Sequence, residues 1–295
     1  MAMIVKFWGV RGSIPTTAQW ARVFGGNTPC VEIRAADGVF ICDAGTGIRE
    51  LGRDLARRSP APKSAHLFLS HLHLDHIQGL PFFLAAVPDL RVHVYGVSDD
   101  DTSRRRLLSG ELGAEFFPQN VEQPRASLAF DQLDDTEPCV IGDVRVRSLP
   151  LKHPGGCHGF VFEHDGRKVV YASDVDLDAG QAGAQERTAT SDVMTLRPVP
   201  RALLNAARGA DLLIVDGQYN DPQYRVRVGS GHSSCLTATD LAIQADVKNL
   251  ALFHHDPDDR DSDVETKVKL CLARAAKLGA ELPIFAAREG VALKF

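Results

Sequence analysis

The sequence predicts an α/β (α+β) fold of four layers, αββα, in which two β-sheets lie between two outer layers of helices. Three observations support this prediction. β-rich runs occur in both halves of the 295-residue chain, helical stretches alternate with them, and no linker rich in Pro, Gly or Ser divides the halves. Because each sheet must bury a face against another layer, two such halves form a sandwich with helices outside. We therefore expect a single domain over residues 1–295.

The first half of the chain is expected to supply one sheet and its helices. Short runs rich in β-branched and aromatic residues predict strands, and longer runs of helical period predict helices. The expected strands cover residues 4–8, 30–35, 39–43, 65–70 and 92–96. The expected helices cover residues 47–58, 77–87 and 104–110.

The second half repeats this scheme after residue 140. The expected strands cover residues 144–149, 159–163, 168–173, 212–216, 249–254 and 291–295. The expected helices cover residues 201–208, 237–245 and 263–278. The polar, irregular stretch 177–200 reads as a long loop, a candidate lid or dimer element.

Composition narrows the classes of function. The net charge of −5 predicts no general attraction to nucleic acid or to an anionic membrane. No apolar run approaches the roughly 20 residues of a membrane span, and the first residues do not resemble a secretory signal. The six cysteines are scattered and form no CxxC pair, so a reduced, cytoplasmic protein without membrane contact is expected.

The stretch from Ser70 to His76 is the strongest functional signal. It follows the apolar run 65–69 and places the metal-competent residues His71, His73, Asp75 and His76 close together. Neutral imidazoles with a carboxylate suit zinc, manganese or iron(II), whereas calcium prefers oxygen ligands alone. This spacing therefore predicts a metal-binding loop at the end of a strand.

Completing a two-metal centre requires ligands from elsewhere in the chain. His153, Asp174 and His254 each follow an apolar strand, so each side chain can turn into a shared edge of the fold. A bridging carboxylate, with histidines on each metal, is the chemistry expected of a binuclear hydrolase.

These segments resemble the metallo-β-lactamase fold hydrolases, in the branch of ribonuclease Z and the phosphoribosyl cyclic phosphodiesterases. The resemblance covers nearly the whole chain, in the family's order: FWGVRGSIPT, GGNTPCVEI, CDAGTGIRELG, SHLHLDHIQGLPFF, LKHPGGCHGFVFE, YASDVD, ADLLIVDGQY, GHSS and LALFHHDP. It implies the four-layer αββα sandwich in a single domain. It also implies two divalent metal ions, with zinc favoured and manganese or iron(II) as alternatives.

The resemblance implies a role for each ligand. One metal ion would be held by His71, His73 and His153, the other by Asp75, His76 and His254, with Asp174 bridging both. A hydroxide between the ions would be the nucleophile. The strand that follows His153 favours it over His158, the residue a lactonase-like pattern would select. The final ligand follows its strand directly in this family, which favours His254 over His255.

Other residues are expected around this centre. By resemblance His232, in a GHS motif, protonates the leaving group with Asp216 as its partner, so that Asp75, His232 and Asp216 form the catalytic set. Asp43 is expected to buttress the histidine loop from outside. The stretch 11–13 (Arg-Gly-Ser) could lie near a phosphate, although so short a motif is weakly specific.

The substrate expected from these features is a small phosphodiester, such as a cyclic one. The interval from His153 to Asp174 is too short for the tRNA-gripping arm of ribonuclease Z, so tRNA is not expected as a partner. A lactone, thioester or amide hydrolase of the same fold is the alternative enzyme, and a non-catalytic metal-binding sensor is the alternative outside enzymes. A homodimer is compatible with the resemblance.

Overall fold

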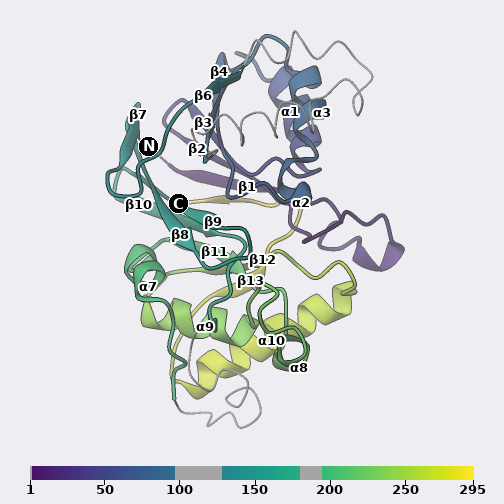
Figure 1. Cartoon of the computed structure of the whole chain (residues 1–295), viewed down its shortest axis with the longest axis vertical. Helices are drawn as coiled ribbons and strands as arrows, with labels where there is room; N and C mark the ends of the chain where they lie inside the picture. Colours follow the sequence, from purple (N-terminus) through teal and green to yellow (C-terminus); the bar gives the residue numbers. More distant parts are fainter. Residues whose placement is uncertain (1, 97–127, 180–194) are drawn as a thin grey trace.

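The computed structural model describes residues 2–96, 128–179 and 195–295. Two β-sheets face each other in the middle of the molecule, and helices cover their outer faces (Figure 1). This arrangement is the predicted αββα sandwich. No helix within the described ranges is long and apolar enough to cross a membrane.

The first sheet is built from the N-terminal half of the chain and the last strand. Its spatial order is β14 (Ala292–Lys294), β1 (Ile4–Gly9), β2 (Cys30–Ala35), β3 (Gly38–Cys42), β4 (Ser64–Phe68), β5 (Arg91–Tyr95) and β6 (Leu128–Phe130). Pairing is antiparallel from β14 to β3 and parallel from β3 to β6. The two termini therefore lie together on β1 and β14, as the N and C marks of Figure 1 show.

The second sheet repeats this mixture of pairings. Its spatial order is β13 (Ile284–Ala286), β12 (Leu250–Phe253), β11 (Leu212–Asp216), β10 (Arg167–Ala172), β9 (Cys157–His164), β8 (Val144–Leu151) and β7 (Cys139–Ile141). The strands from β10 to β13 are parallel, and those from β7 to β10 are antiparallel. The carboxyl ends of β10, β11 and β12 consequently meet at one edge, where side chains can converge.

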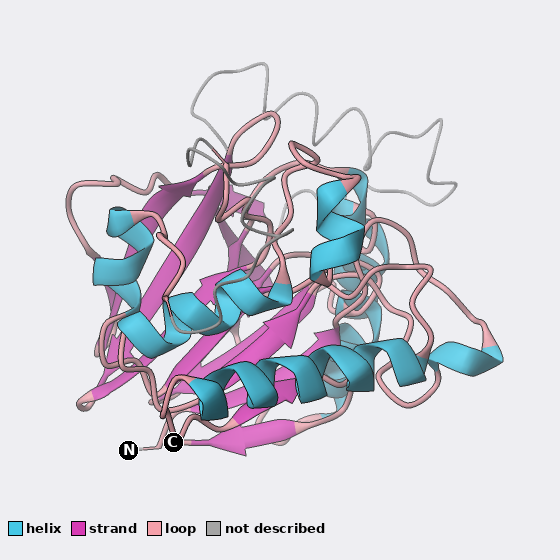
Figure 2. Ribbon diagram, turned by 90° about the horizontal axis from the view of Figure 1, so that it is seen from below, coloured by secondary structure: helices cyan, strands magenta, loops and turns pink. Residues whose placement is uncertain are grey.

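Three apolar clusters hold the layers together. The cluster between the sheets contains aromatic side chains such as Phe40, Phe68 and Phe162. A second cluster packs α1 (Ile48–Arg57) and α3 (Leu80–Ala86) on the first sheet. A third packs α7 (Arg201–Ala207), α9 (Cys235–Gln244) and α10 (Asp261–Lys277) on the second sheet. Figure 2 shows the long helix α10 lying across the strands of this sheet.

The structure differs from the predicted elements in a few places. The expected helix 77–87 is the shorter α3, and a separate short helix, α2 (Leu74–Ile77), precedes it, with Gly79 between the two. A side chain at Gly79 would lie 2.1 Å from the Gly45 carbonyl oxygen, so this turn needs the close approach that glycine allows. The short elements β6, β7, β13 and α8 (Asp221–Arg225) were not expected. The expected helix 104–110 and the centre of the loop 177–200 lie outside the described residues.

Candidate metal centre

The loop after β4 carries the histidine motif to the edge of the sandwich. β4 ends at Phe68, and α2 begins at Leu74, so the motif forms the turn between strand and helix. His71, Asp75 and His76 are buried, while His73 is exposed. The motif therefore presents its side chains inward, toward the second sheet, with one histidine at the open side.

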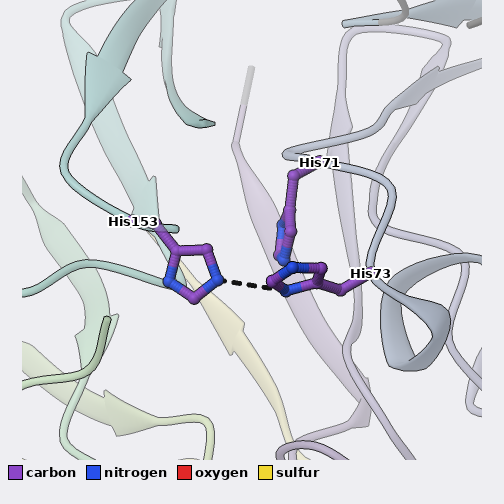
Figure 3. A group of neighbouring side chains, drawn as sticks. All are labelled: His71, His73 and His153. Atoms are coloured by element: carbon purple, nitrogen blue, oxygen red, sulfur yellow. Dashed lines mark hydrogen bonds between the residues drawn. The ribbon is translucent and has the colours of Figure 1, made fainter. Parts of the chain in front are cut away.

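Three imidazoles form a first group at this edge. His71 and His73 come from the motif and His153 follows β8 in the second sheet (Figure 3). Their nitrogens lie within 4.8 Å of one another, with 3.1 Å between His153 Nε2 and His73 Nδ1. The two sheets thus contribute to one group, and the structure brings His153 together with His71 and His73.

A second group lies beside the first. His76 Nε2 and His254 Nε2 are 3.3 Å and 3.2 Å from Asp75 Oδ2. His254 comes from the end of β12, where its backbone has a positive φ of 57°. That conformation turns the chain sharply at the sheet edge and directs the imidazole toward the motif.

Asp174 lies between the two groups. Its Oδ1 is 3.2 Å from His76 Nε2 and 3.3 Å from His254 Nε2. Its Oδ2 is 3.8 Å from His71 Nε2 and 3.8 Å from His153 Nε2. Each carboxylate oxygen therefore faces a different group, which is the arrangement of a bridging carboxylate.

The donor atoms fit divalent transition-metal ions. Ligand atoms about 2.0–2.1 Å from a tetrahedral zinc ion lie about 3.3 Å apart, close to the spacing in the second group. The buried His71 Nε2 has no hydrogen-bond partner among the residues that the structure describes, although a buried polar atom is normally paired. An ion at the first group would supply the missing partner.

The protonation states of His71, His153 and the two carboxylates also favour cations. Burial, together with the nearby His76, lowers the pKa of His71 to about 2, and burial also lowers the pKa of His153. Both imidazoles are therefore neutral near pH 7, the state that binds a metal. Burial by itself would raise the pKa of Asp75 and Asp174, but the neighbouring histidines hold both pKa values below the ordinary range. Both carboxylates stay ionised.

His76 is held from behind by a buried network. Its Nδ1 lies 2.8 Å from Asp43 Oδ2, at the end of β3. The same carboxylate accepts hydrogen bonds from the Ser70 amide and hydroxyl, and from the Tyr171 hydroxyl at 2.6 Å. Asp43 thus supports His76 from behind, the role that the family resemblance implied, whereas its partner Tyr171 on β10 was not predicted.

His232 and Asp216 form a pair at the same edge. Asp216 ends β11, and its Oδ2 lies 2.7 Å from His232 Nδ1, while the Ser233 amide binds the other carboxylate oxygen. Burial opposes protonation of His232, but Asp216 outweighs burial and raises the pKa of His232 to about 9. The imidazole also stacks on His254, with ring centroids 4.8 Å apart.

Two other histidines that the sequence offered lie apart from this centre. His158 is partly exposed, with its Nε2 3.4 Å from Asp135. His255 is buried, and its Nε2 donates to the Ala287 carbonyl. Arg11 is fully buried and donates to the backbone carbonyl oxygen of Asp256, and the expectation that the stretch 11–13 lies near a phosphate stays a prediction.

Comparison with known proteins identifies the family. The model of the β-lactamase superfamily domain matches residues 39–255. The chain belongs to this superfamily. As predicted, it has the metallo-β-lactamase fold of a metal-dependent hydrolase, and that fold implies divalent metal ions.

Several relatives are similar over most of their length. The ribonuclease Z of Natronomonas pharaonis is 26% identical, over 86% of this chain and 87% of its own. The metallo-β-lactamase fold protein YhfI from Bacillus subtilis superposes with a TM-score of 0.71 at 17% identity, covering 100% of this chain and 99% of its own. The short form of human tRNase Z gives a TM-score of 0.63 at 19% identity, covering 98% of each chain.

These findings correct one prediction from the sequence. The exclusion of tRNA as a partner is wrong, because proteins named ribonuclease Z match this chain over 86% of its length. The exclusion relied partly on the net charge of −5. A whole-chain charge does not determine the potential at one edge, where local groups and bound cations dominate.

Proposed function

We propose that the chain is a phosphodiesterase that holds two divalent metal ions at the edge of its sandwich. The proposal rests on the geometry of Asp174, whose two carboxylate oxygens face two separate groups of candidate ligands. The first ion would be held by His71, His73 and His153, and the second by Asp75, His76 and His254, with Asp174 touching both. Such ions polarise phosphoryl oxygens and lower the pKa of bound water.

Side chains of the protein supply the negative charge at the centre and the proton for the leaving group. Asp174 and Asp75 keep negative charge at the centre and hold the ligand sets together. Asp216 fixes the His232 ring through Nδ1, which leaves Nε2 as the nitrogen that can give a proton to a leaving oxygen. This pair suits an ester whose leaving group is a poor one, such as a ribose or alkyl oxygen.

Phosphodiesters are the substrates that this arrangement suits best. The relatives named ribonuclease Z support a nuclease-type reaction, in which water attacks phosphorus and an RNA oxygen leaves. Lactone hydrolysis is the competing reaction. The His232–Asp216 pair argues against lactone hydrolysis, because a lactone opened at the same metal centre does not need His232.

The first test compares metal content and substrates. Purified protein loaded with zinc or manganese should hold two ions per chain by elemental analysis. We expect turnover of bis-p-nitrophenyl phosphate and cleavage of a tRNA precursor with a 3′ trailer, and little opening of a chromogenic lactone. Rapid lactone opening without phosphodiester turnover would refute the proposed reaction, and a single bound ion would refute the proposed binuclear centre.

The second test isolates the acid. His232→Ala should lower kcat by about 10²- to 10⁴-fold for an RNA substrate, the range of general acid catalysis. For bis-p-nitrophenyl phosphate the loss should stay below about tenfold, because nitrophenolate leaves without a proton. Both ions should remain bound. His158→Ala is the control, since this histidine lies outside the centre. Equal losses on both substrates would exclude the acid role.

A further inference from the structure

The segment Arg11–Gly12–Ser13 touches the second group of ligands although it contributes no ligand itself. The Ser13 amide donates a hydrogen bond of 2.8 Å to Asp75 Oδ2. This is the same oxygen that lies 3.2 Å from His254 Nε2. One backbone N–H of this loop therefore orients the carboxylate of one ligand.

Gly12 lies against the ring of another ligand. A Cβ at this position would be 2.4 Å from His254 Nδ1 and 2.4 Å from His254 Cε1. Contacts below about 3.0 Å do not occur between real Cβ atoms and neighbouring atoms, so only glycine leaves room for the imidazole where it stands. The same ring stacks on His232, with the ring planes 17° apart.

His254 depends on this packing because it lacks a hydrogen-bond buttress. Its buried Nδ1 has no hydrogen-bond partner within the described ranges. By contrast, Nδ1 of His76 is paired with Asp43, and Nδ1 of His153 is 2.9 Å from the Gly231 carbonyl. Ligating histidines normally bind an outer acceptor that fixes the ring. At His254, the ring instead contacts Gly12 and stacks on His232.

Arg11 holds the loop in place. Its guanidinium is fully buried and donates to the carbonyl oxygens of Gly25, Asp256 and Asp259. Two backbone bonds connect the loop with the residue after His254, from Gly12 N to His255 O and from His255 N to Val10 O. The start of the chain and the end of β12 thus form one unit.

We infer that Arg11–Gly12–Ser13 is a positioning element for the metal ion held by Asp75, His76 and His254. The loop sets the plane of one ligand by contact and the direction of another by a hydrogen bond. It acts on this ion and leaves the ion at His71, His73 and His153 unaffected. The inference rests on the proposed two-metal centre, so its test must separate the two.

The test is Gly12→Ala, with metal titration calorimetry and elemental analysis as the readouts. We expect one ion to bind as in the natural protein and the other to bind about 10- to 100-fold more weakly, the usual effect of losing an outer-shell contact. Ser13→Ala is the matched control, because it keeps the amide and should keep both affinities. Arg11→Lys should weaken the same ion alone, since lysine lacks the fork of donors.

Ring resonances of His254 and the unfolding temperature of the metal-free protein distinguish a positioning role of the loop from a folding role. In metal-free protein, Gly12→Ala should shift the ring resonances of His254 in nitrogen-edited spectra, whereas Ser13→Ala should not. Two ions bound by Gly12→Ala with natural affinities would overturn the inference while leaving the two-metal proposal intact. Loss of both ions, with a lower unfolding temperature of the metal-free variant, would reduce the loop to a folding role and also overturn it. A natural protein that binds one ion would instead contradict the proposed function.

Discussion

His76 and His254 face the same carboxylate oxygens but are held in opposite ways. His76 is fixed by hydrogen bonds through Asp43, which also binds Ser70 and Tyr171. His254 is instead packed against Gly12 and stacked on His232. A hydrogen-bonded ligand should be sensitive to loss of a polar partner, and a packed ligand to added volume. The comparison therefore predicts which kinds of substitution each ligand tolerates.

Removing the polar buttress should have the largest effect. Asp43→Ala leaves the imidazole of His76, the Ser70 hydroxyl and the Tyr171 hydroxyl without their buried acceptor. We expect the metal-free protein to lose about 3–5 kcal/mol of unfolding free energy, the cost of breaking a buried charged pair. Urea unfolding measures this loss. Asp43→Asn should lose less, because an amide oxygen still accepts. Equal stability of Asp43→Ala and the natural protein would contradict the role of this network.

Adding volume beside the first group should have an intermediate effect. Gly231 has a positive φ of 94°, and a Cβ there would lie 2.5 Å from His153 Nδ1. Gly231→Ala should therefore weaken the ion of the first group by about tenfold or more, the effect of disturbing a ligand's outer contacts. Metal titration would show this as a change in one of two binding steps.

Gly229→Ala is the matched control for this prediction. Gly229 has a similar positive φ of 84°, but nothing lies within 4 Å of the added Cβ. Both variants should lose about 1–2 kcal/mol of unfolding free energy from the left-handed backbone. Only Gly231→Ala should lose metal affinity. If Gly229→Ala lost as much affinity, backbone strain and not the contact with His153 would be the cause.

Removing a single hydrogen bond from the buttress should have the smallest effect. Tyr171→Phe deletes one donor to Asp43 and leaves the His76 and Ser70 contacts in place. We expect a loss of about 1–2 kcal/mol in unfolding free energy and less than about threefold in metal affinity. Tyr95→Phe is the control, because its hydroxyl lies 3.1 Å from His66 Nδ1 in the same core, away from the metal ligands. It should change stability alone.

The elements that the sequence predicted well are those with strong local patterns. The strand 212–216 was predicted with its observed bounds, and the expected helix 47–58 differs from α1 by one residue at each end. Strands of three residues, such as β7 and β13, are too short for an alternating pattern to be recognised. The helix α8 did carry a signal, since Asn220 and Gln223 form a capping box around its first turn.

The candidate site also contains features that the sequence predicted and features that it did not. The motif around His71 and the strand ends before His153, Asp174 and His254 could be found because each signal lies within a few residues. The contacts of Tyr171 and Gly12 could not be found that way. Tyr171 binds Asp43, which lies 128 residues away in the sequence, and Gly12 contacts the ring of His254 from the other half of the chain.

By itself, the sequence determined the two-sheet architecture and the residues that we propose as metal ligands. Hydrophobic period and ligand chemistry are local properties, so they can be read from neighbouring residues. Only the tertiary structure decided that Arg11 is buried and binds backbone carbonyls, and that the ring of His254 contacts Gly12. These features depend on how the two sheets meet, because packing and burial arise between segments that are distant in the chain.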